Sequence, residues 1–432
     1  MELSKPKFIF VSQYGSKKTI AIAKKTKFVK KVILLDGKGD NTFTISLQDF
    51  ISNAKNDSFN IEDHVCQEVD IYKQVALIVY SSGTTGLPKG VQITQANMMD
   101  CLSGYREMYQ LVRLVYEESL VNLNVAPWFH ALGFMSMYMT ACSHEGKYIF
   151  LPKFDEVAFL RSIEKYKVNV ATVVPPIMVF LAKSPLFDQY DLSTIKEIGC
   201  GAAVLTKQIE EQVKKRFKDQ VQIRQGYGMS ETTLGTLTAV MVKPGSVGSP
   251  VKGVYVKVID EDGKTLGPNL PGELCFKGKR IMLGYINDPI ATKETVHSDG
   301  WLHSGDIGYY DEDFQFYIVD RLKELIKYKA LQVAPAEVEG ILFSHPMIKD
   351  AGVIGIPDEA CGELPFGFVV KQPGAKLTEQ EVIDFVAENS SKAKRLHGGV
   401  RFIDEIPKNP SGKIMRRILR EMYTKSSIKS KL

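Results

Sequence analysis

The sequence predicts an α/β fold that is divided into more than one domain. Its 432 residues exceed what one hydrophobic core usually supports. Short apolar runs rich in β-branched residues alternate with segments of helical periodicity, as in residues 7–35, which is typical of a mostly parallel sheet. Hydrophobic residues make up 44% of the chain and charged residues 24%, so sizeable cores can form.

The expected elements of the first half follow from these runs. Turn residues punctuate them, as in the Gly- and Asp-rich cluster at 36–41. Strands are expected at 7–11, 31–35, 75–80, 120–125, 168–174, 196–201 and 221–224. Helices are expected at 17–30, 94–115 and 206–217, the last with apolar residues four apart.

The second half predicts a different layout. Residues 254–259 alternate in polarity and precede a further strand at 272–278, which indicates an antiparallel layer. Beyond it we expect a helix at 336–345, strands at 351–356 and 366–371, a helix at 378–389 and a strand at 400–406. Thr378 and Glu381 form a capping box for the second of these helices.

Charge and composition exclude several classes of protein. A net charge of +5 on so long a chain is mild, so we expect no nucleic-acid partner. No apolar run approaches the ~20 residues of a membrane span, and the stretch after Met1 is too brief for a signal peptide. The six cysteines form no C-x-x-C pair and indicate neither a zinc site nor a disulfide framework.

The last three residues match an address signal. Ser430-Lys431-Leu432 is the peroxisomal S-K-L motif, whereas the alternative is a basic, solvated tail. The strictly C-terminal position favours the address. We therefore expect a peroxisomal protein that binds the peroxisomal import receptor.

One glycine- and hydroxyl-rich loop carries the strongest functional signal. The sequence SSGTTGLPKG at 81–90 follows the expected strand at 75–80 and offers three glycines, four hydroxyls and Lys89. Backbone N–H groups and hydroxyls of such a loop can bond phosphate oxygens, while the lysine adds a mobile charge. A plain solvated turn needs only one or two such residues. The P-loop G-x-x-x-x-G-K-[ST] is excluded because Gly90 follows Lys89 at the position where Ser or Thr is required.

Five later stretches hold residues whose chemistry is ambiguous by itself. His130 among aromatic residues could line a pocket or be a hydrogen-bonded core residue, and the small residues 199–203 could admit a flat ring or form a tight turn. Glu231 amid hydroxyls could bind a hydrated magnesium ion or cap a helix. Asp306 on a glycine-flanked loop suits a ribose diol, and Lys413 after Ser-Gly could be a surface lysine.

The order of these motifs resembles the adenylate-forming superfamily of acyl-CoA synthetases, 4-coumarate:CoA ligases and beetle luciferases. The resemblance runs from about residue 7 to the C-terminus through SSGTTGLPKG, PWFHALG, YGMSET, WLHSGD, DRLKELIK and PKNPSGK. It implies a large N-terminal AMP-binding domain of several subdomains over 1–319, a hinge at 320–322 and a small, mobile α+β domain over 323–432.

The resemblance also implies the site. Lys413 becomes the adenylation lysine, His130 an acyl-site and gating residue, and Lys327 a further catalytic candidate, with Glu231 as the magnesium ligand. Tyr227 would stack on adenine, and Asp306 with Arg321 would bind ribose or phosphate. The full set of expected nucleotide-binding residues is Ser81, Ser82, Gly83, Thr84, Thr85, Gly86, Lys89, Gly201, Ala202, Ala203, Gly226, Tyr227, Gly228, Ser230, Asp306 and Arg321.

The implied reaction uses ATP, Mg²⁺ and coenzyme A. A carboxylic acid attacks the α-phosphate of ATP and releases pyrophosphate, and the acyl-adenylate then reacts with the thiol of coenzyme A after the small domain rotates about Asp320. The first step needs charge neutralisation and alignment more than an acid or a base. We expect an ATP-dependent acid–thiol ligase that has a small-molecule carboxylic acid and coenzyme A as partners.

Within the superfamily the chain most resembles beetle luciferases and luciferase-like insect fatty acyl-CoA synthetases. Cys101 stands where luciferases have arginine, and Leu234 where they have serine. Both changes make the pocket less polar, so a medium- or long-chain fatty acid is expected over luciferin or a 4-coumarate-type acid. Ala330 occupies a family glycine beside the thiol approach, where its methyl group would hinder coenzyme A.

The phosphate loop comes early in this chain. Family members carry more sequence before it than the 80 residues present here, so an N-terminal portion of the large domain is expected to be missing. The alternative to a ligase is therefore an inactive relative that binds nucleotide or a partner without turnover.

Overall fold

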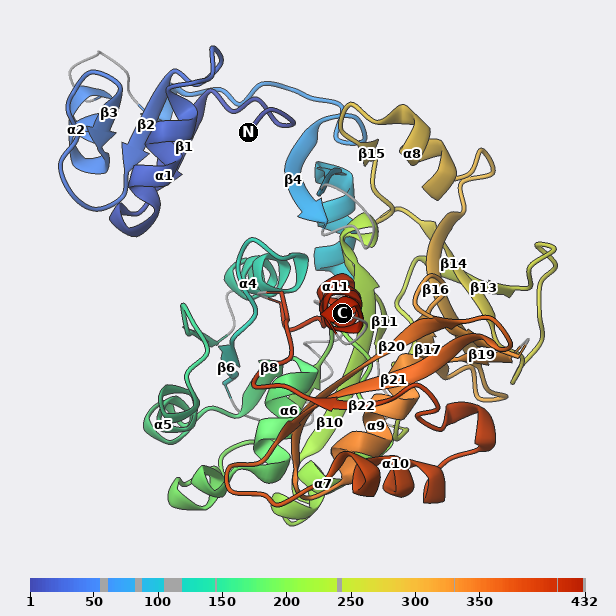
Figure 1. Ribbon diagram of the computed structural model, residues 1–432. Coiled ribbons are helices and arrows are strands. Elements are labelled where there is room, and N and C mark those ends of the chain that lie inside the picture. The colour runs from blue at the N-terminus through green and yellow to red at the C-terminus, as the bar shows by residue number, and fades with distance from the viewer. Residues whose placement is uncertain are drawn as a thin grey trace. The chain divides into compact units, whose positions relative to one another are not determined.

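In a computed structural model of the chain, the described residues are 1–54, 61–81, 88–104, 119–143, 146–238, 243–329, 331–409 and 411–429. They form two compact units (Figure 1). The first joins Met1–Gln95 to Leu283–Pro289, and the second joins Ala96–Met282 to Ile290–Leu432. Within the described part of the chain, no helix has the length and apolar character needed to cross a membrane.

The first unit holds two small sheets. One is the parallel sheet β1-β2-β3 and the other is the antiparallel sheet β15-β5-β4. Its elements are β1 (Phe8–Val11), α1 (Gln13–Ala23), β2 (Lys31–Leu34), β3 (Thr44–Ser46), α2 (Leu47–Ala54), η1 (Ile61–Asp63), β4 (Val75–Ser81), β5 (Lys89–Thr94) and β15 (Gly284–Tyr285). The helix expected at 17–30 was placed wrongly, because the Thr26 hydroxyl bonds the Ala23 carbonyl and ends α1 there.

The second unit is built on a seven-stranded sheet of order β12-β11-β10-β9-β8-β6-β7. Strands β7, β6, β8, β9 and β10 run parallel, as predicted, and β11 and β12 are antiparallel to them. The strands are β6 (Val121–Asn124), β7 (Lys147–Phe150), β8 (Val170–Val173), β9 (Glu197–Cys200), β10 (Gln222–Met229), β11 (Leu234–Thr238) and β12 (Ser249–Pro250).

Helices pack on this sheet and complete one apolar core. The helical elements are α4 (Ala131–Ser143), α5 (Glu156–Tyr166), α6 (Pro175–Lys183), η2 (Pro185–Gln189), α7 (Lys207–Arg216) and η3 (Ser230–Thr232). Phe159 of α5, Met178 of α6 and Val213 of α7 are fully buried in this core. Residues 95–104, the described start of the helix expected at 94–115, are helical as well.

The antiparallel layer predicted from the sequence is confirmed. Its sheet has the order β13-β14-β16-β17, and the first two strands match the predicted ranges. The elements are β13 (Val254–Ile259), β14 (Gly272–Gly278), α8 (Pro289–Thr295), β16 (Leu302–Tyr310) and β17 (Phe316–Arg321).

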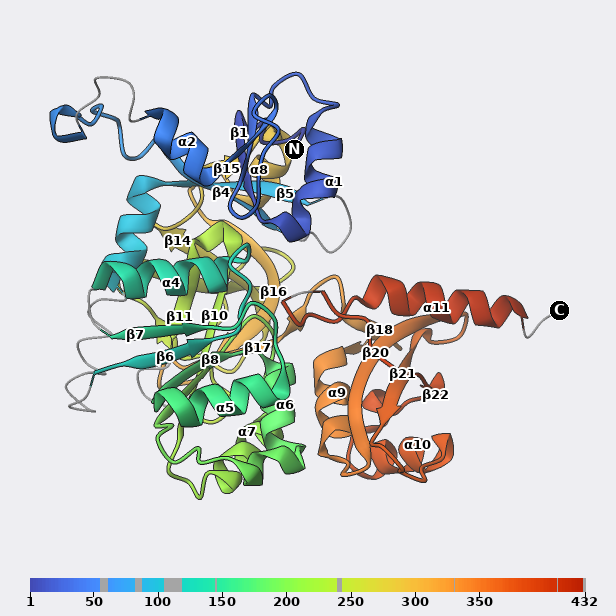
Figure 2. The ribbon, with the colours of Figure 1, turned by 90° about the vertical axis from the view of Figure 1, so that its left-hand side faces the viewer.

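The C-terminal elements form a further sheet flanked by helices, on the right-hand side of Figure 2. They are β18 (Ile326–Tyr328), β19 (Leu331–Val333), α9 (Pro335–Ser344), β20 (Ile348–Asp358), β21 (Gly362–Lys371), α10 (Glu379–Glu388), η4 (Lys392–Lys394), β22 (Gly399–Phe402) and α11 (Arg416–Lys429). The capping box of α10 is present: Thr378 Oγ1 accepts from the Glu381 N–H at 3.2 Å, and the Thr378 N–H donates to Glu381 Oε2 at 2.8 Å.

Candidate active site

Several predicted site residues follow the carboxyl ends of the parallel strands. His130 lies beyond the end of β6, Gly201, Ala202 and Ala203 follow β9, and Tyr227 lies near the end of β10. In open α/β sheets, ligands bind outside the carboxyl ends of the strands. The topology therefore brings these stretches, far apart in the sequence, to one edge of the sheet.

A close backbone approach explains Gly228 at this edge, whereas a Cβ on Gly201 would meet only ordinary van der Waals contact. A Cβ on Gly228 would lie 1.6 Å from the Leu234 carbonyl oxygen, so only glycine fits between β10 and β11. A Cβ on Gly201 would lie 3.4 Å from the carbonyl oxygen of Gly226. These positions were predicted as nucleotide contacts, and the structure shows that Gly228 is needed for strand pairing as well.

Asp306 joins Tyr227 and Arg321. The Tyr227 hydroxyl donates to Asp306 Oδ2 at 2.5 Å, and Arg321 Nε lies 3.2 Å from Asp306 Oδ1. Asp306 and Arg321 are register partners in β16 and β17, so strand pairing fixes their proximity. Burial, the Asp306 charge and their hydrogen bond raise the pKa of Tyr227 well above its ordinary value, so the phenol stays protonated. Its ring stacks on Phe276, with centroids 5.5 Å apart.

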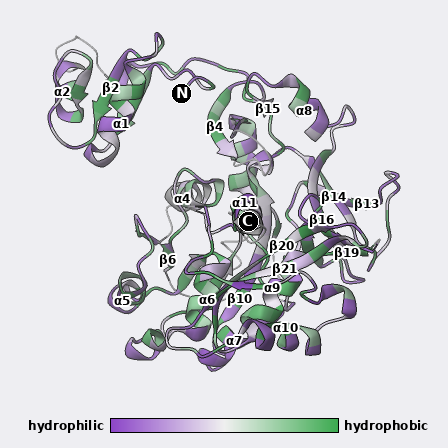
Figure 3. Ribbon diagram, viewed as in Figure 1, coloured by the Kyte–Doolittle hydropathy of each residue, from purple (hydrophilic) through white to green (hydrophobic). Residues whose placement is uncertain are grey.

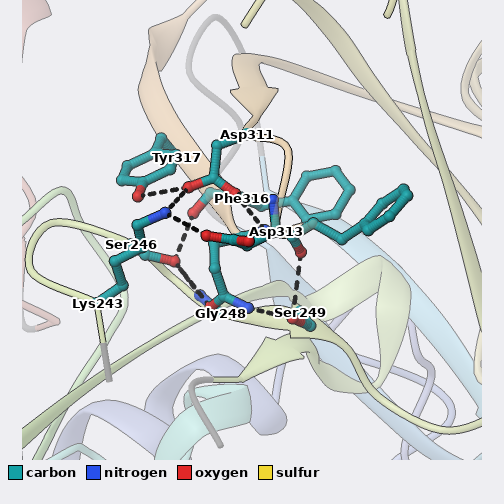
Figure 4. Close-up of polar contacts among 10 residues, drawn as sticks. Lys243, Ser246, Gly248, Ser249, Asp311, Asp313, Phe316 and Tyr317 are labelled. Carbon is teal, nitrogen blue, oxygen red and sulfur yellow. Dashed lines mark hydrogen bonds and ion pairs between the residues drawn. The ribbon is translucent and has the colours of Figure 1, made fainter. Parts of the chain in front are cut away.

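A polar network holds the turn between β16 and β17 (Figure 4). Lys243 bonds Asp311 and lies 3.1 Å from Asp313, and Asp311 Oδ2 also accepts from the Tyr317 hydroxyl at 3.1 Å. The Ser246 hydroxyl donates to the Phe316 carbonyl at 3.1 Å. The hairpin that carries Asp306 and Arg321 is thus fixed at its far end too.

The carboxylate of Glu273, on β14, supports the part of β16 that precedes Asp306. Its Oε1 accepts from the Gly305 N–H at 2.9 Å, while Oε2 lies 3.0 Å from His303 Nδ1. Cys275 Sγ approaches the same ring nitrogen at 3.6 Å, so these three side chains form one His/Cys/Glu cluster. Cys275 and Glu273 both contact Nδ1 of His303, and Glu273 also bonds the Gly305 backbone. The cluster is therefore a hydrogen-bonded support for the segment of β16 that carries Asp306.

Lys413 follows a tight turn whose shape Asn409 sets. Asn409 Oδ1 accepts from the N–H groups of Ser411 and Lys413, each at 3.0 Å, and Gly412 adopts a φ of +82°, which favours glycine. Burial and the charge of Arg321 lower the pKa of Lys413 to about 8, while the carboxylates of Asp306 and Glu231 oppose that shift. The charges of Arg321, Asp306 and Glu231 therefore act on this ammonium group.

Glu231 lies in η3, directly after β10. It is buried, and its carbonyl oxygen accepts from the Met282 N–H at 2.9 Å. Ser230 and Thr232 are buried beside it, so a carboxylate and two hydroxyls occupy one short turn. Oxygen donors of this kind fit a hard cation such as Mg²⁺.

His130 precedes α4, and its Nδ1 accepts from the Leu132 N–H at 3.3 Å. Burial, together with the nearby charge of Lys413, lowers the pKa of His130 to about 4. The ring is therefore neutral at pH 7 and carries its hydrogen on Nε2, a state compatible with the wall of an acyl pocket.

Cys101 and Leu234, the two positions that differ from luciferases, lie in one apolar cluster. Both side chains are buried, and Leu132, Phe134 and Tyr138 from the α4 region pack against them. Burial raises the pKa of the Cys101 thiol to about 11, so it is a neutral packing group.

The sequence reasoning missed Arg280, the largest fully buried side chain among the described residues. Its Nε donates to Asp100 Oδ2 at 3.0 Å, and its Nη1 donates to the Gly235 carbonyl at 2.9 Å. The Thr233 hydroxyl in turn donates to the Arg280 carbonyl at 2.7 Å. Arg280 thus ties the helix at 95–104 to the turn after Glu231. Its one signal in the sequence is a charge directly before an apolar run.

The remaining predicted residues belong to other elements or lie outside the described residues. Lys327 is exposed on β18, where its N–H donates to Glu363. Ser81 and Lys89 belong to the first unit, in which the Lys89 ammonium lies 4.6 Å from the ring centroid of Tyr285. The other predicted positions, Ser82, Gly83, Thr84, Thr85, Gly86, Ala330 and the tripeptide 430–432, lie outside the described residues.

Family comparison decides the class to which this geometry belongs. Residues 1–286 match the AMP-binding enzyme family, and residues 337–413 match the AMP-binding enzyme C-terminal domain. The chain belongs to the AMP-binding enzyme family. The predicted membership of the adenylate-forming superfamily is thereby confirmed, and so is the predicted α/β fold class.

Curated relatives in this family include luciferases and coumarate ligases. The chain is 44% identical to luciferin 4-monooxygenase of Photinus pyralis over 434 residues, covering 99% of this chain and 77% of that protein. It is 42% identical to 4-coumarate:CoA ligase 1 of Petunia hybrida over 370 residues, covering 83% of this chain and 67% of that protein.

Solved structures of the family agree with the fold. ATP-bound MatB from Rhodopseudomonas palustris matches with a TM-score of 0.83 and 26% identity, covering 98% of this chain and 80% of that chain. The anthranilate CoA ligase AuaEII, in complex with anthranoyl-AMP, matches with a TM-score of 0.85 at 21% identity, covering 98% of this chain and 79% of that chain.

Proposed function

We propose that this chain is an ATP-dependent acid–thiol ligase that converts a medium- or long-chain fatty acid to its acyl-CoA in peroxisomes. The observation that carries the proposal is the position of Lys413, whose ammonium lies in the field of Arg321, Asp306 and Glu231. A cation beside a nucleotide site suits the attack of one anion, a carboxylate, on another, a phosphate.

In the first step, a carboxylate oxygen bonds to the α-phosphorus of ATP while the bond to the leaving pyrophosphate breaks. Lys413 would bond both the attacking carboxylate and the α-phosphate, and Asp306 would exchange its bond from Tyr227 for ribose hydroxyls. Glu231 would hold Mg²⁺, which when bound neutralises phosphate charge. His130, which is neutral at pH 7, would line the acid-binding pocket without forming an ion pair with the substrate carboxylate.

In the second step, the coenzyme A thiolate attacks the acyl carbon, and AMP leaves with the electron pair of the acyl–oxygen bond. Asp320 suits the proposed hinge, because its Oδ2 accepts from the Ala336 N–H at 3.0 Å and its Oδ1 from the Arg321 N–H at 2.7 Å. This carboxylate thereby links β17 to the start of α9. Rotation about it would withdraw Lys413 and admit the thiol.

The apolar cluster of Cys101 and Leu234 supports a fatty acid over a polar aromatic acid. The test is pyrophosphate release and acyl-CoA formation with fatty acids, 4-coumarate and luciferin. We expect turnover with fatty acids. Turnover with 4-coumarate or luciferin alone would overturn the fatty-acid assignment, and no release from folded protein with any acid would overturn the ligase in favour of a nucleotide-binding relative. Adenylate without acyl-CoA would overturn the thiol step.

A matched pair of variants tests the pocket. Leu234→Ser should lower kcat/KM for fatty acids by about ten-fold, because lost apolar contact of this size is worth ~1–3 kcal/mol. Leu270→Ser, at a half-exposed position, should leave it unchanged. Equal effects of the two substitutions would show that Leu234 does not contact the acid.

The peroxisomal part of the proposal rests on Ser430-Lys431-Leu432. A fluorescent fusion at the N-terminus should enter peroxisomes, and deletion of these three residues should leave it in the cytosol. The same distribution for both proteins would overturn the assignment.

A further inference from the structure

The position of Lys413 depends on how the C-terminal elements lie against the helices of the seven-stranded sheet. Figure 2 shows α9 beside α6 and α7, and α7 packs against α9. Helix α7 is largely hydrophilic, whereas α9 carries apolar residues in its second half (Figure 3). Phe343 of α9 packs against the cores of both regions. Three further contacts, one polar and two steric, join the same two regions around this apolar contact of Phe343.

The first of these contacts is a lysine at the end of α6. Lys183 Nζ donates to the carbonyl oxygens of His345 at 3.1 Å and Ile348 at 2.7 Å, directly after the last turn of α9. The C-terminal end of a helix carries partial negative charge, so a cation there is favourable. Burial lowers the pKa of Lys183 to about 8, and the nearby Asp350 carboxylate partly offsets that effect. One side chain thus bridges the segments that match the two family domains.

The second contact is steric. A Cβ built on Gly340, in the middle of α9, would lie 2.4 Å from Thr206 Cγ2 and 3.2 Å from Thr206 Cβ. Thr206 is the N-cap residue of α7. Alanine is better than glycine in a helix by ~1 kcal/mol, so glycine at this position is explained by the close approach of Thr206 and not by helix stability.

The third contact adjoins the lysine of the site. A Cβ on Gly412 would lie 3.3 Å from both Pro176 Cγ and Val174 Cγ2, at the start of α6. Helix α6 therefore faces the C-terminal elements at both ends, with Gly412 at its start and the last turn of α9 at its end. Lys413 comes immediately after the first of these contacts.

We propose that Lys183 and Gly340 are positioning residues for adenylation, which hold the C-terminal elements where Lys413 meets Asp306, Arg321 and Glu231. Neither residue touches substrate. This inference rests on the proposed function, because it assigns these residues to one of its two half-reactions. Thioester formation takes place after Lys413 has withdrawn, so it does not use these contacts.

The test separates the half-reactions in single-turnover experiments. Lys183→Met keeps the apolar stem but removes the donor, and it should slow adenylation by about ten-fold, since hydrogen bonds to charged groups are worth ~1.5–3 kcal/mol. The reaction of coenzyme A with supplied acyl-adenylate should keep its rate. Lys207→Met, at an exposed lysine on α7, is the matched control and should change neither step.

Gly340→Ala should reproduce the selective loss, because the added methyl group meets Thr206 only in this arrangement. Combining it with Thr206→Ser, which removes the methyl carbon at 2.4 Å, should restore adenylation. Equal losses in both half-reactions, unchanged adenylation, or no rescue by the double variant would overturn the proposal.

Hydrogen exchange makes the test independent of turnover. Without substrate, amides at 335–348 should exchange faster in Lys183→Met than in the wild type or in Lys207→Met, because α9 leaves the α6–α7 face more often. Unchanged exchange would overturn the positioning role. If the exchange rates differ in this way but the wild-type chain adenylates no acid, only the proposed function is refuted and the positioning role stands.

Discussion

Two parts of the candidate site differ in how they are held. Asp306, Arg321 and Tyr227 lie on paired strands, and the register of β16 and β17 makes the first two neighbours. Lys413 lies on a turn that the Asn409 side chain shapes, and its place depends on contacts between α9 and the α6–α7 face. Strand pairing positions the strand-held part, whereas the packing of α9 against α6 and α7 positions the turn-held part. Substitutions in the first part should therefore change the free energy of unfolding or the binding of AMP, whereas substitutions at the contacts that place Lys413 should slow one reaction step.

The largest effect is expected at Arg280, which ties the helix at 95–104 to β11, the strand that pairs with β10. Arg280→Met leaves Asp100 without its partner and should lower the free energy of unfolding by about 3 kcal/mol, measured by urea denaturation. Arg417→Met removes only an exposed ion pair with Glu421 and should change it by less than about 0.5 kcal/mol. Equal changes would show that Arg280 is not an anchor.

A smaller effect is expected at Asp306. Asp306→Asn removes the negative charge that pairs with Arg321 and accepts the hydrogen bond of the Tyr227 hydroxyl. A hydrogen bond to a charged group is worth ~1.5–3 kcal/mol. AMP should bind about ten-fold more weakly in calorimetry. Asp313→Asn, at a mostly exposed carboxylate of the same hairpin, should bind AMP as the wild type does, and a comparable loss there would refute the role of Asp306.

The smallest effect concerns His130, beside the turn-held part. Its pKa lies near 4 in the folded chain and at 6.5 ordinarily, so the unfolded chain binds more protons between these values. The free energy of unfolding should thus fall as the pH drops from about 6.5 towards 4, and His130→Gln should lose less stability over that range. In an NMR titration the His130 ring should show no midpoint near 6.5. Finding one would contradict the burial described.

The sequence predicted two strands of the antiparallel layer but not the two that hold Asp306 and Arg321: Asp306 was expected on a glycine-flanked loop, whereas it lies in β16, paired with β17. Strand periodicity placed 254–259 and 272–278, because alternation reports burial directly. It stopped β10 too early, at residue 224, because Gly226 and Gly228 break the apolar pattern although they pair with β11. The helix expected at 17–30 lies at Gln13–Ala23, and the Thr26 hydroxyl bonds the Ala23 carbonyl at its end.

The motifs nominated Tyr227, Asp306 and Arg321, which the structure joins by a hydrogen bond and an ion pair, but these contacts could not be read from the sequence. Arg280, Lys183 and Gly340 lie outside every motif, since their roles arise only when distant elements meet. Spacing along the chain reports local chemistry, whereas the partners of a buried or interfacial side chain depend on tertiary packing.

The central claim is that Lys413, which the packing of α9 against α6 and α7 positions, completes a site whose Asp306 and Arg321 lie on paired strands. Acid-dependent exchange of labelled pyrophosphate into ATP measures it most directly. Lys413→Ala should lower the exchange rate by about 10²–10³, the usual loss of one well-placed charge donor, with AMP binding retained. Lys425→Ala, at an exposed position, should exchange at the wild-type rate. Undiminished exchange in Lys413→Ala, or loss of AMP binding along with exchange, would contradict the account.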